Sequence, residues 1–291
     1  MRLVSFRRDG VEELGVVRPD GRYLPASALG GALPATMLEL LRRGPVGIAA
    51  LRAAAVAAPP SVETVDPASV ELLAPVPRPG KVIAVGLNYN DHAAEGGRAA
   101  PAQPMLFAKF PTSVIGPGAT VEWDPALTAK VDLEAELGVV IGQTARRVAE
   151  ADALDVVAGY TIVNDVSARD LQAADKQFVR AKSLDTFCPM GPVLVTADEI
   201  PDPQRLAIRG SRNGVVMQDA NTRQMIFSVA NLIAFCSRAF TLEPGDVIAT
   251  GTPSGVGIYR EPPVLMGEGD VMTIEIEGIG ALTNPCRFWQ G

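Results

Sequence analysis

The segment Val131–Gly142 combines closely spaced acidic residues with an apolar run, and it constrains the fold more than any other stretch. Its alternation predicts a β-strand with two unlike faces, formed by Asp132, Glu134 and Glu136 on one side and by Leu133, Ala135 and Leu137 on the other. The carboxylates of Glu134 and Glu136, about 7 Å apart on such a strand, repel each other unless a cation lies between them. We therefore expect a cation site where this strand enters the core; the alternative is the solvated face of an edge strand.

Few nitrogen or sulfur ligands are available for that cation. The chain has one histidine, His92, and three cysteines far apart in the sequence, Cys188, Cys236 and Cys286. This pattern predicts neither a disulfide framework nor a thiolate zinc site. A site made of oxygen ligands selects a hard cation such as Mg²⁺, Mn²⁺ or Ca²⁺.

Composition excludes several classes of partner. The net charge is -7 and the sequence pI is near 4.9, without a basic block, so neither nucleic acid nor an anionic membrane is an expected partner. The N-terminal residues lack an apolar run after their charges, and no other stretch has the length of a transmembrane span. We expect a cytoplasmic protein.

The chain of 291 residues divides into two expected domains. Residues 1–74 contain a hairpin signal at Asp9–Gly10 followed by helical spacing, and they form a small N-terminal α/β accessory domain without a chemical cluster. A proline-rich connection leads to the catalytic domain, residues 75–291. Many short alternating runs there predict a β-rich α+β fold.

Several motifs after residue 81 are candidates for chemistry. Asn90 or Asp91 could cap a helical turn that places His92 and Glu95 on one face, three residues apart. Lys182 is expected in a loop. The glycine-rich segment 251–257 lacks the lysine of a P-loop, the third glycine of a dinucleotide fingerprint and the serine position of a nucleophile elbow.

Taken in order, these motifs resemble the fumarylacetoacetate hydrolase superfamily, which also includes acylpyruvases, oxaloacetate decarboxylases and hydroxyhepta-dienedioate isomerases. The resemblance spans about Lys81 to Pro285. It rests on five segments: Gly86–His92, Asp132–Glu136, Asn164–Asp170, Lys182 with Asp185–Phe187, and Pro244–Gly257.

The resemblance implies a fold, a site and an assembly. The fold would be a mixed β-sandwich roll with few helices, and members are typically homodimers. The implied roles are metal ligation by Glu134, Glu136 and Asp165, catalysis by His92, Glu95 and Lys182, and substrate binding by Arg169, Gln172 and Thr252. The long eukaryotic type adds an aspartate at the place of Val85, so the similarity is to shorter bacterial members, which use Mg²⁺ or Mn²⁺.

The reaction expected from this resemblance is hydrolysis of a C–C bond in a 2,4-dioxo acid of the acylpyruvate or fumarylacetoacetate type. His92, held by Glu95, would activate water, and the divalent ion would stabilise the enolate that leaves. Three carboxylates, the ion, Lys182 and Arg169 sum to about +1, which suits a small anionic oxo-acid substrate.

Two alternatives stay open. One is an isomerase, tautomerase or decarboxylase that acts on a hydroxymuconate- or oxaloacetate-type diacid at the same site, where no water attacks. The other is a catalytically idle homologue that keeps the metal for folding, against which the intact Glu-x-Glu, Asp and His-x-x-Glu motifs argue together.

Overall fold

Two large sheets and one short ladder make up most of the protein, which is seen here in a computed structural model that describes residues 1–290. The larger sheet is mixed and has 11 strands. In spatial order it contains β3 (Tyr23–Pro25), β2 (Val11–Val17), β1 (Arg2–Arg8), β13 (Cys188–Thr196), β11 (Val157–Asn164), β10 (Ala135–Ile141), β16 (Val247–Ala249), β5 (Val82–Gly86) and β6 (Met105–Lys109), with β4 (Glu71–Leu72) beside β1 and β7 (Val114–Ile115) beside β13.

The second sheet has five strands: β15 (Val215–Asn221), β14 (Ala207–Arg212), β17 (Val271–Ile276), β18 (Gly280–Phe288) and β8 (Val121–Trp123). A separate ladder joins β9 (Val131–Asp132) to β12 (Ser167–Ala168). The α-helices are short: α1 (Met37–Arg42), α2 (Gly44–Ala57), α3 (Asn90–Glu95), α4 (Arg169–Asp175), α5 (Phe178–Lys182) and α6 (Val229–Ala239). The predicted β-rich α+β class is therefore confirmed.

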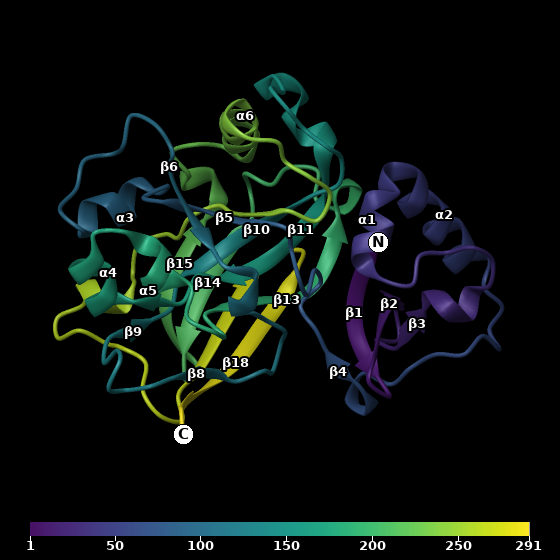
Figure 1. The fold of residues 1–291 in the computed structure, drawn as a ribbon, viewed down its shortest axis with the longest axis horizontal. Helices are drawn as coiled ribbons and strands as arrows, with labels where there is room; N and C mark the ends of the chain where they lie inside the picture. Colours follow the sequence, from purple (N-terminus) through teal and green to yellow (C-terminus); the bar gives the residue numbers. More distant parts are fainter. Residues whose placement is uncertain (291) are drawn as a thin grey trace.

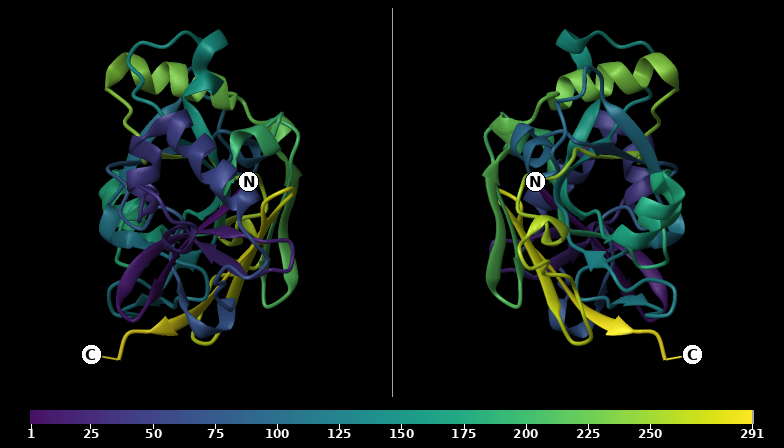
Figure 2. Two further views of the ribbon diagram at one scale, coloured as in Figure 1. Left: turned by 90° about the vertical axis from the view of Figure 1, so that its right-hand side faces the viewer. Right: turned by 90° about the vertical axis from the view of Figure 1, so that its left-hand side faces the viewer.

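The helices lie in three places. Figure 1 shows α3, α4 and α5 near β9 at one end of the molecule, and α1 and α2 beside the N-terminal hairpin at the other. The two side views in Figure 2 show α6 lying across the top, above the curved sheets. Within residues 1–290, no helix is both long and apolar enough to cross a membrane.

The predicted acidic strand is divided in two. Val131–Asp132 pairs with β12, whereas the segment from Ala135 onward pairs with β11 and β16, so Leu133 and Glu134 lie between two ladders. The continuous strand that we predicted is therefore wrong, because its first residues leave the main sheet for another partner. All residues of β10 are buried, which excludes the solvated edge strand.

Two local expectations around the site also need correction. Lys182 is not in a loop: it is the last residue of α5, and only 2% of its surface is exposed. The cap of α3 is Tyr89, which lacks a capping side chain, rather than Asn90 or Asp91. Asn88 holds this turn instead, because its side chain bonds the carbonyl of Thr250 at 2.7 Å and the backbone of a neighbouring loop.

The N-terminal segment continues the main sheet because β1 pairs with β13, with Leu3 opposite Leu194. The Ser5 hydroxyl donates to the Pro75 carbonyl at 2.8 Å, and Phe6 packs in the same apolar cluster as the centre of β10. The segment thus contributes to the common core. Its division from residues 75–291 as a separate domain stays a prediction.

This packing predicts that the N-terminal segment stabilises the protein without taking part in the chemistry. Leu3 is fully buried, so Leu3→Ala should lower the free energy of unfolding by about 2–5 kcal/mol. Val46→Ala, at a position that is 80% exposed, should change it by less than about 0.5 kcal/mol. Denaturant unfolding measures both. Turnover per folded molecule should stay constant in both variants. A fall in turnover per folded molecule in Leu3→Ala would assign the segment a role in the site.

Candidate active site

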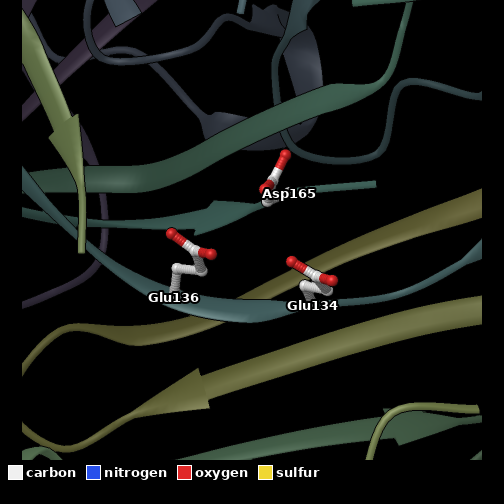
Figure 3. A group of neighbouring side chains, drawn as sticks. All are labelled: Glu134, Glu136 and Asp165. Atoms are coloured by element: carbon white, nitrogen blue, oxygen red, sulfur yellow. The ribbon is translucent and has the colours of Figure 1, made fainter. Parts of the chain in front are cut away.

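Three acidic side chains meet where β10 begins and β11 ends. Figure 3 shows Glu134 and Glu136 on one chain segment and Asp165 on the neighbouring one. The antiparallel register pairs Ala135 with Asn164, and the Asp165 N–H donates to the Glu134 carbonyl at 3.0 Å. The backbone therefore sets the three carboxylates side by side, each offering an oxygen within 4.8 Å of the others.

Buried cations compensate two of these carboxylates. Lys182 donates to Glu134 at 2.8 Å and to Asp165 at 2.6 Å, and Lys109 donates to the other Asp165 oxygen at 2.6 Å. The second Glu134 oxygen lies 2.6 Å from the Arg169 guanidinium. Burial alone would raise the pKa of Glu134, but Lys182 and Arg169 outweigh it and hold that pKa well below its ordinary value.

Glu136 has no such partner. It is 1% exposed, and its hydrogen-bond donor is the N–H of Gly251, at 2.9 Å, rather than a cation. Burial, followed by the nearby carboxylates of Asp165 and Glu134, raises the pKa of Glu136 well above its ordinary value. A buried carboxylate beside two others, without a cation of its own, is an arrangement that a bound metal ion would balance.

The donor set fits a hard divalent cation. Oxygen atoms within 4.8 Å of one another can share one ion, since Mg–O distances are about 2.1 Å and Ca–O distances about 2.4 Å. Burial raises the pKa of the nearby Cys188 to about 12, so its thiol is neutral in the metal-free protein, and Cys188 is not one of the gathered ligand residues. Within residues 1–290, no other group of three His, Cys, Asp or Glu side chains gathers in this way.

Two charged residues in this cluster were absent from the predicted site. Lys109 and Asp132 are both buried, and the Arg169 Nε donates to Asp132 at 3.0 Å. One residue is positive and the other negative, so together they leave the net charge of the site with a divalent ion at about +1. The charge balance from which we expected an anionic substrate is therefore unchanged, and the substrate itself stays a prediction.

His92 and Glu95 form a hydrogen-bonded pair on α3, at the predicted spacing. The His92 Nδ1 lies 2.7 Å from a Glu95 oxygen, and the second Glu95 oxygen accepts the Gly255 N–H at 2.8 Å. The ring is 7% exposed. Because Nδ1 is engaged, Nε2 is the nitrogen left for a reacting proton.

The loop from Gly251 to Gly255 connects the carboxylate cluster with this pair. Its first N–H binds Glu136 and its last binds Glu95. A Cβ at Gly255 would lie 2.2 Å from the Met217 carbonyl, and the residue has φ +100°, so both space and conformation require glycine. The loop also presents the Thr252 hydroxyl, which accepts a hydrogen bond from Gln218 at 2.7 Å and keeps its own proton for another partner.

One cavity of about 300 Å³ brings most of the predicted residues together. Its lining includes six of them: His92, Glu134, Arg169, Gln172, Lys182 and Thr252. Glu95, Glu136 and Asp165 are not among the lining residues. Glu95 and Asp165 contact the lining through His92 and Lys182, and Glu136 is held by the Gly251 N–H next to Thr252. Val85, at the place of the extra aspartate of the long type, also lines the cavity.

Sequence reasoning missed four residues around this cavity. Lys109 had a usable signal, since a lysine inside an apolar strand is unusual, and Asp132 stood on the predicted acidic face. Arg98 and Lys130 line the cavity from exposed loops, where nothing in the sequence separates them from ordinary surface cations.

Comparison with known proteins extends the likeness over the whole chain. Oxaloacetate tautomerase fahd2, mitochondrial, from Xenopus laevis is 42% identical over 294 residues, covering 98% of this chain and 90% of that protein. The structure of fumarylacetoacetate hydrolase from Exiguobacterium antarcticum superposes with a TM-score of 0.86 at 39% identity, covering 99% of this chain and 100% of that one.

A third similar protein was solved with ligands. Maleylpyruvate hydrolase from Sphingobium sp. SYK-6, in complex with manganese(II) ion and pyruvate, gives a TM-score of 0.81 at 35% identity, with 100% of both chains covered. The family model "Fumarylacetoacetate (FAA) hydrolase C-terminal" matches residues 81–287, which include all nine predicted site residues. The chain therefore belongs to the fumarylacetoacetate hydrolase family.

Proposed function

We propose that this protein is a divalent-metal-dependent tautomerase that interconverts the enol and keto forms of a small 2-oxo diacid of the oxaloacetate type. The observation that carries the proposal is that one cavity of about 300 Å³ is lined by His92, Glu134 and Lys182 together. A cavity of this size suits a small substrate. The full-length similarity to a protein named oxaloacetate tautomerase supports the choice of reaction.

Glu134, Glu136 and Asp165 would hold the ion, Mg²⁺ or Mn²⁺, which supplies Lewis-acid stabilisation of negative charge on substrate oxygens. The Lys182 ammonium has three donors, of which two bind Glu134 and Asp165, so one is free for substrate. The Thr252 hydroxyl and the Arg169 side chain face the same cavity and would orient the carboxylate.

The reaction moves one proton. From enol to keto, the oxygen on C2 loses a proton, C3 gains one, and the double bond moves from C2–C3 to C2–O, with no other σ-bond made or broken. His92 can take up and deliver this proton through Nε2, while Glu95 fixes the ring and stabilises its protonated form. Low solvent exposure of the ring limits exchange of the proton with bulk water.

A second candidate is the C–C hydrolase expected from the sequence. The His92–Glu95 pair favours it, because an imidazole oriented by a carboxylate is also the arrangement that activates water. Here the water oxygen would add to the 4-oxo carbon of a 2,4-dioxo acid, the bond between C3 and C4 would break, and C3 would take a proton. The substrate would be an acylpyruvate.

Assays with two substrates, oxaloacetate and acetylpyruvate, distinguish the two candidates. With Mg²⁺ present, the protein should speed the loss of the enol absorbance of oxaloacetate well above the rate with Mg²⁺ alone. Acetylpyruvate should yield no pyruvate at a comparable kcat/KM. Catalysed pyruvate release without catalysed tautomerisation would replace the first candidate by the second.

Metal binding should depend on Glu136 in a distinctive way. EDTA should abolish activity and Mg²⁺ or Mn²⁺ should restore it, since the ligands are carboxylate oxygens. Glu136→Gln should weaken metal affinity while leaving the melting temperature of the metal-free protein unchanged or higher, because it removes a buried charge without a cationic partner.

Glu134→Gln is the matched comparison. It leaves Lys182 and Arg169 with less compensation, so it should destabilise the metal-free protein by on the order of 1–3 kcal/mol. Equal loss of stability in both variants, or full activity after EDTA, would contradict the assignment of Glu136 as a metal ligand. Calorimetric metal titration and thermal unfolding provide the measurements.

Proton transfer should depend on His92 and less on Glu95. His92→Ala should lower kcat by about 10²–10⁴-fold, the range typical of a lost general acid–base group. Glu95→Gln keeps an oxygen for Nδ1 but loses the negative charge, so its kcat should fall by a smaller factor. Metal affinity should be unchanged in both variants. A His92→Ala enzyme with wild-type kcat on every substrate tested would exclude this role.

A further inference from the structure

The lining of the cavity combines buried residues of the carboxylate cluster with exposed residues, and two of the exposed ones are cationic. Buried Glu134 and Lys182 belong to its wall, and so do the exposed residues Arg98 and Lys130. Two other cations of the cavity, Arg169 and Lys182, are paired with protein groups. Within residues 1–290, the side chains of Arg98 and Lys130 form no salt bridge or hydrogen bond. They are therefore available to a ligand.

The backbone beside Lys130 is held in place. Asp170 accepts the Thr128 hydroxyl at 2.6 Å and the Ala129 N–H at 2.9 Å, and the Lys130 carbonyl accepts the Arg169 N–H at 2.8 Å. Both oxygens of Asp170 are thus engaged by the loop that carries Lys130. The loop keeps this lysine beside the start of α4, whose residues Arg169 and Gln172 also line the cavity.

Arg98 is attached to the other wall. It follows α3, which carries His92 and Glu95, and its N–H donates to the Ala93 carbonyl at 2.8 Å. Gly97, with φ +63°, makes the turn that brings it back toward the helix. The two cations therefore approach the cavity from separate elements, α3 and the segment before β9, which Figure 1 shows at the same end of the molecule.

We propose that Arg98 and Lys130 bind the distal carboxylate of the substrate and make the site selective for 2-oxo diacids over 2-oxo monoacids. The proposal rests on the proposed function and deepens it. The 2-oxo acid end lies at the carboxylate cluster, where Lys182 and Thr252 are available. The second carboxylate then points outward, where two cations without partners meet it in water-accessible space.

The test uses two matched pairs of ligands, each differing by one negative charge. The first pair is oxaloacetate and its 4-methyl ester, compared by turnover with Mg²⁺. The second is 2-oxoglutarate and its 5-methyl ester, compared by calorimetric binding to the Mg²⁺-loaded protein. The variants are Arg98→Gln, Lys130→Gln and the double substitution. Arg205→Gln, an exposed site that lies outside this cavity and is 82% exposed, is the control.

Each single substitution should weaken diacid binding about tenfold, and the double substitution more, through KM rather than kcat. Affinity for the esters should be unchanged, and Arg205→Gln should behave as the wild type. The proposal would be overturned if the substitutions lowered the affinity for diacid and ester equally, or did not lower the affinity for the diacid. If the wild type binds 2-oxoglutarate more tightly than its ester yet does not tautomerise oxaloacetate, the proposed reaction fails while the carboxylate subsite stands.

Discussion

The structure of this site depends on the balance of charge around three buried carboxylates. Water cannot screen charges at this depth, so each carboxylate needs a cation or a proton. Lys109, Lys182 and Arg169 satisfy Glu134 and Asp165, and Glu136 is left over. The fold therefore leaves one carboxylate, that of Glu136, without a cation. The strands β10 and β11 and the helices α4 and α5 surround it.

Much of this site could be predicted because several of its residues are close together in the sequence. Glu134 and Glu136 are two residues apart on an extended segment, and His92 and Glu95 are three apart on a helical turn, so the pairing of each set follows from backbone geometry. The hairpin at Asp9–Gly10 was foreseeable for the same reason. The homodimer and the cytoplasmic location stay predictions.

What could not be predicted arises from contacts between distant segments. The acidic segment splits because Asp132 pairs with Ser167, a partner that alternation alone cannot reveal. The N-terminal hairpin joins the main sheet because Leu3 meets Leu194, and local pattern contains no record of such a pairing. The apolar strand around Lys109 marks this lysine as unusual, but its ion pair with Asp165 depends on the tertiary fold.

The loop from Gly251 to Gly255 limits how this protein can change during evolution. It holds a carboxylate of the cluster with one N–H and a carboxylate of the His92 pair with another, while Thr252 faces the cavity between them. A substitution in this loop disturbs the carboxylate cluster, the His92 pair and the cavity wall together, so few substitutions there are compatible with the site. Within the part of the chain that the structure describes, Arg98 and Lys130 make no such contacts through their side chains. In their proposed role, a change at either position would alter substrate preference while the carboxylate cluster and the His92 pair stay as they are.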